Sequence, residues 1–175
     1  MKHLLIASLI ILLISCHNDE GKSPPSSSES SWEALISTQG CLGGSRNNLN
    51  GYHEGSCLAE KPWVDYLSNR SDQKIDFLLE RMASTQPTNI HNCAFGNAME
   101  GELAVYILQQ LTGKLWFDYS GTNQELLAVV SAYNKAMEEG SLVSDHATLG
   151  EILASDSQRG ALNEYFKEGH GAKAK

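Results

Sequence analysis

Basic residues are scarce in this 175-residue chain: 13 Lys and Arg stand against 21 Asp and Glu, a formal net charge of −8. A nucleic-acid-binding protein needs a basic stripe to neutralise phosphates, and the basic residues cluster here only in the Lys173/Lys175 tail. The composition therefore argues against nucleic acid as a partner. An acidic surface keeps a protein soluble, and it also suits a basic protein partner attracted by electrostatic steering.

Motifs that carry chemistry are also missing. The chain has no Gly-x-Ser-x-Gly nucleophile elbow and no phosphate-binding Gly-x₄-Gly-Lys-Ser/Thr loop. His53, Cys57, His91 and Cys93 could supply zinc ligands, but His91-x-Cys93 lacks the spacing of a structural zinc pair. The 47–57 stretch lacks the glutamate that ends a calcium loop. The sequence predicts a protein that is not an enzyme, with no metal and no cofactor.

The apolar run near the N-terminus is too short to stay in a membrane. Leu4–Ile14 has eleven residues, only Ser8 among them being polar, whereas a transmembrane helix needs about 20 apolar residues. Lys2 and His3 precede the run as a small basic region. This order of charge and apolar residues is typical of a secretion signal that is removed from the mature protein.

The residues that close this run carry a more specific pattern. Leu13-Ile14-Ser15-Cys16 resembles the lipobox of bacterial lipoproteins. The resemblance implies diacylation of Cys16, cleavage before it and acylation of the new amino terminus, and several acyl chains anchor a protein stably. It also implies the outer membrane, with the domain facing the periplasm or the surface, because His17 stands where aspartate would favour inner-membrane retention. The lipid bilayer, through acylated Cys16, is thus one expected partner.

Four segments follow from this interpretation. We expect a signal peptide over 1–15, a lipidated cysteine with a disordered tether over 16–31, a single helical domain over 32–168 and a flexible basic tail over 169–175. The tether is rich in Ser and Pro and has no apolar side chain that could support a core. The mature chain would have 12 basic and 21 acidic residues, a formal charge of −9.

Helical periodicity dominates the domain, and no stretch alternates between apolar and polar residues over a useful length. The spacing predicts helices over 32–38, 62–68, 72–84, 94–112 and 124–139, one from about 144 through 153, and one from about 155 through 166. The helix over 94–112 is apolar nearly all round, which predicts a central position. The fold class that follows is all-α: a compact bundle of about five to seven helices, partly disulfide-stapled.

The odd number of remaining cysteines limits which disulfide can form. With Cys16 lipidated, Cys41, Cys57 and Cys93 remain, so one disulfide and one thiol are expected in an oxidising compartment. A Cys41–Cys57 bridge is favoured, because the two residues bracket a loop rich in Gly, Asn and Ser that has little else to hold it. Closing such a loop contributes on the order of 3 kcal/mol. The alternative pairs Cys93 with Cys41 or Cys57.

The candidate polar cluster is His91, Glu100 and Glu102, near the start of the predicted central helix. Glu102 falls on an apolar face and needs a partner, for which Arg70, Arg81 and His91 are candidates. One interpretation is a core ion pair or a helix-start carboxylate near the dipole. The other is a paired-carboxylate hydrolase similar in outline to glycosidases.

These observations favour a membrane-anchored envelope lipoprotein with a non-catalytic domain that binds an envelope or periplasmic protein, for which a basic protein is suited. Two alternatives remain. One is an immunity or inhibitor protein against a periplasmic toxin or lytic enzyme. The other is a hydrolase acting on peptidoglycan.

Lipidation of Cys16 makes a prediction about thiols. The mature monomer, denatured without reductant, should react with one equivalent of a thiol reagent, because one of the three remaining cysteines is left over. The Cys16→Ala variant should move from the membrane fraction to the soluble fraction. A wild-type chain that stays soluble, or a monomer with no reactive thiol, would contradict the assignment.

Overall fold

The computed structural model describes residues 27–42, 57, 60–92, 96–141 and 143–171. The predicted signal peptide, Cys16, most of the tether, Cys93 and the end of the basic tail lie outside these residues. The helices are α1 (Ser27–Ile36), α2 (Lys61–Ser68), α3 (Asp72–Arg81), α4 (Glu100–Thr112), α5 (Gln124–Glu138), α6 (Asp145–Ala154) and α7 (Asp156–Gly171), with a 3₁₀ turn at Trp116–Asp118. The predominance of helix is confirmed.

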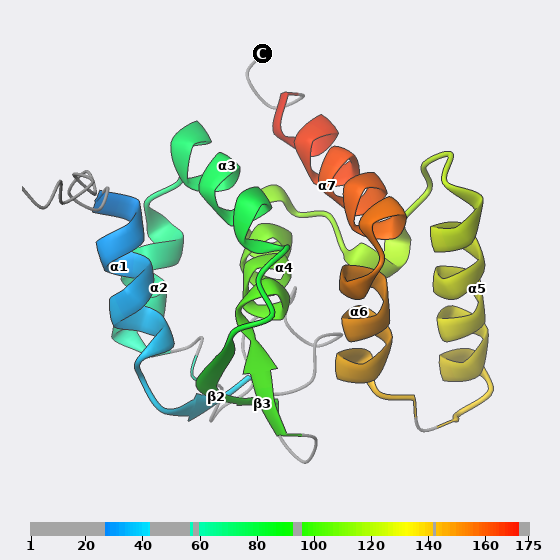
Figure 1. Ribbon diagram of the computed structural model, residues 1–175, viewed down its shortest axis with the longest axis horizontal. Helices are drawn as coiled ribbons and strands as arrows, with labels where there is room; N and C mark the ends of the chain where they lie inside the picture. Colours follow the sequence, from blue (N-terminus) through cyan, green and yellow to red (C-terminus); the bar gives the residue numbers. More distant parts are fainter. Residues whose placement is uncertain (1–26, 43–56, 58–59, 93–95, 142, 172–175) are drawn as a thin grey trace, which may run out of the picture.

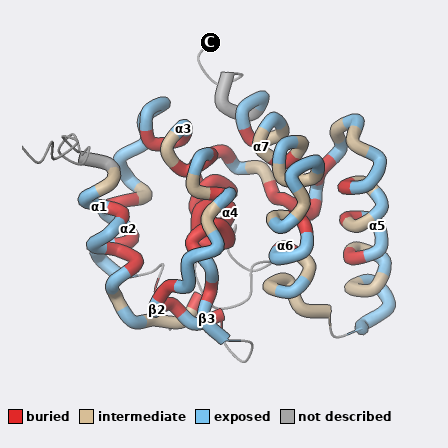
Figure 2. Tube along the Cα trace, viewed as in Figure 1, coloured by how far each residue is buried: buried red, intermediate tan, exposed pale blue. Residues whose placement is uncertain are grey.

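Helix α4 lies at the centre, with α1, α2 and α3 on one side and α5, α6 and α7 on the other (Figure 1). Twelve of its thirteen residues are buried, and Figure 2 shows it as the most continuously buried element. Gly113 ends the helix as predicted, in the left-handed conformation (φ 73°) that glycine adopts without a Cβ penalty. A helix that is apolar nearly all round is expected to be buried, and this one forms the core of the molecule.

Several helix starts agree with the sequence. Ser71 Oγ accepts a hydrogen bond from the Lys74 amide at the start of α3. Asn123 Oδ1 does the same for Leu126 at the start of α5. Each cap satisfies an amide that the first turn of a helix leaves without an intrahelical partner. Helix α1 begins at Ser27, inside the segment predicted as tether, and α7 continues to Gly171, inside the predicted tail.

The prediction of an all-α domain without strands is wrong in one region. A small sheet of order β1-β2-β3 is formed by β1 (Gly40–Cys41), β2 (Pro87–Asn92) and β3 (Gly96–Met99). β1 pairs with β2 in parallel, and β2 pairs with β3 in antiparallel orientation. The predicted central helix therefore begins at Glu100 and not at residue 94.

The missed strand has a physical reason. β2 does alternate in burial, but two of its three inward residues, Thr88 and Asn92, are polar, and only Ile90 is apolar. Hydrophobic periodicity therefore carries no sign of a strand there. The Thr88 hydroxyl donates to the Ala98 carbonyl at 2.8 Å, so the buried polar side chain is satisfied across the β2–β3 pair.

The favoured Cys41–Cys57 bridge is also wrong. No disulfide joins two of the described residues: Cys57 keeps its thiol and is buried, whereas Cys41 is disulfide-bonded and so has its partner elsewhere in the chain. Cys57 nevertheless lies against the same strand, because a Cβ added at Gly40 would meet the Cys57 Cβ at 2.3 Å.

The start of α4 is held against the end of α3 by a close backbone approach. The Gly101 amide donates to the Ser84 carbonyl at 3.2 Å, and the Glu100 amide donates to the Gln86 carbonyl at 2.9 Å. A Cβ at Gly101 would lie 2.7 Å from the Met82 carbonyl oxygen and 2.9 Å from that of Ser84. Only glycine fits at this position, because backbone atoms cannot move aside as a side chain can.

A pair of glycine substitutions tests this contact. Gly101→Ala should lower the free energy of unfolding by about 1–3 kcal/mol, the usual cost of overpacking. Gly150→Ala in α6 is the matched control, because its Cβ would meet nothing within 4 Å, and it should raise stability by up to about 1 kcal/mol. Urea denaturation followed by circular dichroism measures both, and equal effects would refute the close approach.

Candidate functional site

The structure separates the three residues predicted to form one polar cluster. His91 is exposed on β2, and no hydrogen bond joins it to Glu100 or Glu102 among the described residues. Glu100 and Glu102 are both buried, each 1% exposed, but they face different neighbours. His91, one of the three candidate partners considered for Glu102, is therefore not its partner.

Glu100 holds together the elements on the α1 side of α4. Its carboxylate accepts the Trp32 indole N–H at 3.0 Å and a hydrogen bond from the Ser84 hydroxyl. Arg81 lies 3.9 Å away and also pairs with Glu29 of α1 at 3.3 Å. Trp32 is fully buried, so its N–H would be costly to leave without an acceptor. This carboxylate is a structural tie between α1, α3 and α4.

Glu102 makes the corresponding connection on the other side of α4, to helix α6. Its Oε1 lies 2.6 Å from Nδ1 of His146 in α6, and its Oε2 accepts the Met99 amide at 2.9 Å. The second contact caps α4, where a carboxylate is also favoured by the positive end of the helix dipole. Both oxygens of this buried carboxylate are therefore engaged, as a charge at such depth requires.

Tyrosines extend this polar region. Burial, with the nearby charges of Glu102 and Asp145, raises the pKa of Tyr106 well above its ordinary value, so its hydroxyl stays protonated at neutral pH. The Asn92 amide lies 3.5 Å from that hydroxyl, and the Tyr133 hydroxyl donates to Asp145. These groups are engaged with one another, which is the arrangement of a polar core.

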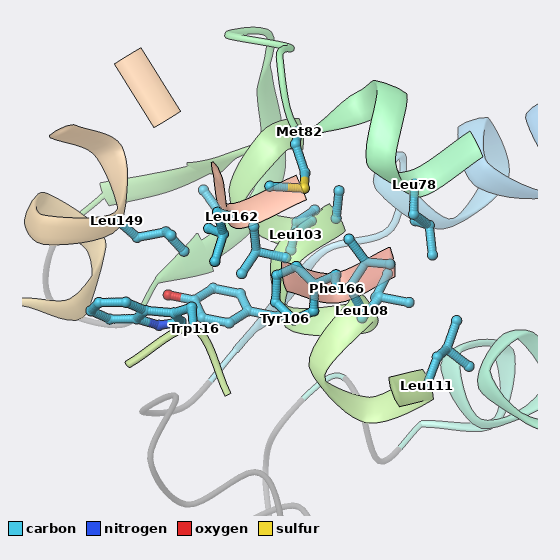
Figure 3. Packing of buried hydrophobic residues seen from close by; sticks show 14 of the residues in the cluster. Leu78, Met82, Leu103, Tyr106, Leu108, Leu111, Trp116, Leu149, Leu162 and Phe166 are labelled. Atoms are coloured by element: carbon cyan, nitrogen blue, oxygen red, sulfur yellow. The ribbon is translucent and has the colours of Figure 1, made fainter. Parts of the chain in front are cut away.

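Apolar side chains surround this region on the remaining sides. Figure 3 shows the Tyr106 ring close to Trp116, with Leu103, Leu149 and Leu162 around them. All five of these residues are at most 2% exposed. The tyrosine and the indole therefore serve the packing of the core between α4, α6 and α7.

A groove lies on the other side of the molecule, between α1, α2 and the start of α3. Its volume is about 810 Å³, within the range of small-molecule and peptide sites. Figure 1 shows α1 and α2 side by side at this edge. The groove is lined by Ser31, Ala34, Leu35, Thr38, Pro62, Asp65, Tyr66, Asn69, Ser71, Gln73 and Lys74.

Lys74 is the unusual residue of this groove. It is 6% exposed, and its Nζ donates to the Tyr66 carbonyl and lies 4.0 Å from the centroid of the Tyr66 ring. In the part of the chain that the structure describes, no carboxylate lies within 4.0 Å of this nitrogen. Burial lowers the pKa of the Lys74 ammonium, because the charged form is desolvated.

Tyr66 shares this environment. Its hydroxyl is buried and has no hydrogen-bond partner among the described groups, and burial raises its pKa to about 12. The groove therefore combines a buried cation with a buried hydroxyl that can still donate. Buried hydroxyls normally have partners and buried charges normally have counter-charges, but the described residues supply neither a partner for the Tyr66 hydroxyl nor a counter-charge for Lys74.

Sequence reasoning missed this site, although a pattern was present. Lys74 stands four residues before Leu78 and directly before Ile75, so it falls on the buried stripe of α3. A lysine on such a stripe is as unusual as the glutamate at 102 on the central helix. Neither residue lies in a recognisable motif.

The described residues were also searched for metal sites and membrane-spanning helices, and the chain was compared with known proteins. No group of three or more His, Cys, Asp or Glu side chains is arranged there to hold a metal ion, although His53 and Cys93 lie outside these residues. No helix in the same part of the chain is long and apolar enough to cross a membrane. Comparisons with protein families, curated proteins and solved structures found no match for this chain.

The Glu102–His146 pair gives a stability prediction. His146→Ala leaves the buried carboxylate with only the Met99 amide, so the free energy of unfolding should fall by about 3 kcal/mol or more. Lys135→Ala is the control: it breaks the exposed Lys135–Glu139 pair and should change stability by less than about 1 kcal/mol. Similar losses in the two variants would show that the buried pair is not a structural tie.

Proposed function

We propose that this chain is an envelope lipoprotein, anchored through Cys16, whose helical domain is a non-catalytic binding module. The groove between α1, α2 and α3 is the observation that carries the proposal. It is large enough for a segment of a partner, and it contains a buried ammonium without a counter-charge and a buried hydroxyl without a hydrogen-bond partner among the described residues.

The position of the groove supports the same proposal. α1 forms one wall of it and follows directly on the Ser/Pro-rich segment that would link the domain to the lipid. Because α1 begins at Ser27, the segment between Cys16 and this helix is residues 17–26, and a flexible tether of that length reaches about 15–20 Å, so the groove would meet partners close to the membrane. We infer the outer membrane from His17, as the lipobox resemblance implies.

Lipidation of Cys16 would also complete the disulfide. Cys57 keeps its thiol and Cys41 is disulfide-bonded. If Cys16 carries acyl chains, Cys93 is the only cysteine left to pair with Cys41. We therefore propose a Cys41–Cys93 bridge, with Cys57 as the single thiol of the mature chain.

The immunity or inhibitor role is a more specific form of this proposal, and the acidic charge of the chain suits it. The hydrolase alternative would require Glu102 to act on a substrate. Glu102 is 1% exposed, and both of its oxygens have partners within the chain. The groove on the α1 side therefore supports a binding function better than the Glu102 region supports catalysis.

Photocrosslinking in cells tests the binding proposal. A photoreactive amino acid at Ala34, an exposed position that lines the groove, should yield one discrete crosslinked species with the full-length lipoprotein. The matched control is Ala132, which is equally an exposed helical alanine but lies on α5. No adduct at Ala34, or the same adducts at both positions, would count against a binding groove.

A further inference from the structure

The groove contains a cation whose charge the described chain does not balance. A lysine that is 6% exposed loses most of its hydration, and its ammonium has three donors. One donates to the Tyr66 carbonyl, and the Tyr66 ring lies against the charge. A carbonyl and a ring face do not neutralise an ammonium, so the site is electrostatically complementary to an anion.

The surroundings favour an anion further. Lys74 lies in the first turn of α3, where backbone amides and the helix dipole attract negative charge. Asp65, the acidic residue that lines the groove, is paired with Lys61. The Tyr66 hydroxyl remains protonated at neutral pH, so it keeps a donor that no described group uses.

We infer that this groove binds a peptide through its free C-terminal carboxylate, with Lys74 as the carboxylate-binding residue. This inference rests on the proposed binding function and names its ligand class. A single buried ammonium matches one negative charge, which selects a carboxylate over a phosphate dianion, particularly in a chain of formal charge −8. The rest of the lining fits peptide groups, because the exposed amide side chains of Asn69 and Gln73 offer both donors and acceptors.

The apolar part of the groove completes this fit. Leu35 and Pro62 give one wall without charge, suited to small peptide side chains. A fatty carboxylate would satisfy Lys74 equally well, but its alkyl chain would offer no hydrogen bond to the exposed amide side chains of Asn69 and Gln73 in place of the water that it displaces. The polar lining thus favours a peptide over a lipid as the source of the carboxylate.

Calorimetric titration of the full chain tests the inference with defined probes. N-acetyl-trialanine should bind, and its C-terminal carboxamide should bind roughly tenfold to hundredfold more weakly, because it loses a charge-assisted hydrogen bond. Decanoate and inorganic phosphate are the competing ligands, and both should bind more weakly than the free peptide. A carboxamide that binds as well as the acid overturns the inference, and so does a preference for decanoate or phosphate.

Three lysine variants test whether Lys74 causes the preference for the acid over the carboxamide. Lys74→Gln should abolish the preference for acid over amide while Lys74→Arg retains it. Lys114→Gln is the matched control, because Lys114 Nζ likewise donates to a tyrosine carbonyl, that of Tyr165 at 2.6 Å, and lies 4.3 Å from the centroid of that ring, but it does not line the groove. An unchanged preference in Lys74→Gln would refute the assignment.

A tyrosine variant covers the case in which Lys74→Gln fails to fold. Tyr66→Phe removes only a hydroxyl that has no partner in the described chain, so the variant should be at least as stable as the wild type and bind the peptide several-fold more weakly. Unweakened binding by a folded Tyr66→Phe would exclude its hydroxyl from the site. If Ala34 still crosslinks to a partner while no probe distinguishes acid from amide, the inference fails and the binding function stands.

Discussion

Two buried carboxylates at the first turn of α4 determine how the two halves of the molecule meet. Glu100 and Glu102 are two positions apart, which places them about 200° apart around the helix axis. One therefore faces the layer of α1 and α3, and the other faces α6. Each would be prohibitively costly without its own donors, so each half of the molecule must supply them in the correct place. The helix dipole assists both charges.

The requirement that a buried charge has partners is met at α4 but is not fully met at the groove. Glu100 and Glu102 have their donors within the chain, whereas the Lys74 ammonium has a carbonyl and a ring but no counter-charge among the described residues. A core position with such a group is less stable than an apolar one would be. Natural sequences depart from local consistency mainly at functional sites, and the imbalance at Lys74 is the reason that we propose the groove, and not the Glu102 region, as the binding site.

The sequence predicted what depends on local periodicity and capping, and it failed where the determining partner is distant. The α3 cap at Ser71 and the α4 end at Gly113 follow from neighbouring residues. The partner of Glu102 is His146, which lies 44 residues further along the chain, and no pattern near residue 102 points to it. β2 was missed because its inward residues are mostly polar, and their pairing with β3 supplies what hydrophobicity does not.

Gly101, between the two glutamates, fixes the rotational phase of α4. Its backbone lies against the carbonyls of Met82 and Ser84, where any other residue would hold the helix away. A shift by one residue would turn the helix by about 100° and direct both carboxylates into apolar layers. A helix that is apolar nearly all round could pack in several rotational orientations. The close approach at Gly101 allows only the orientation in which both glutamate side chains find their donors.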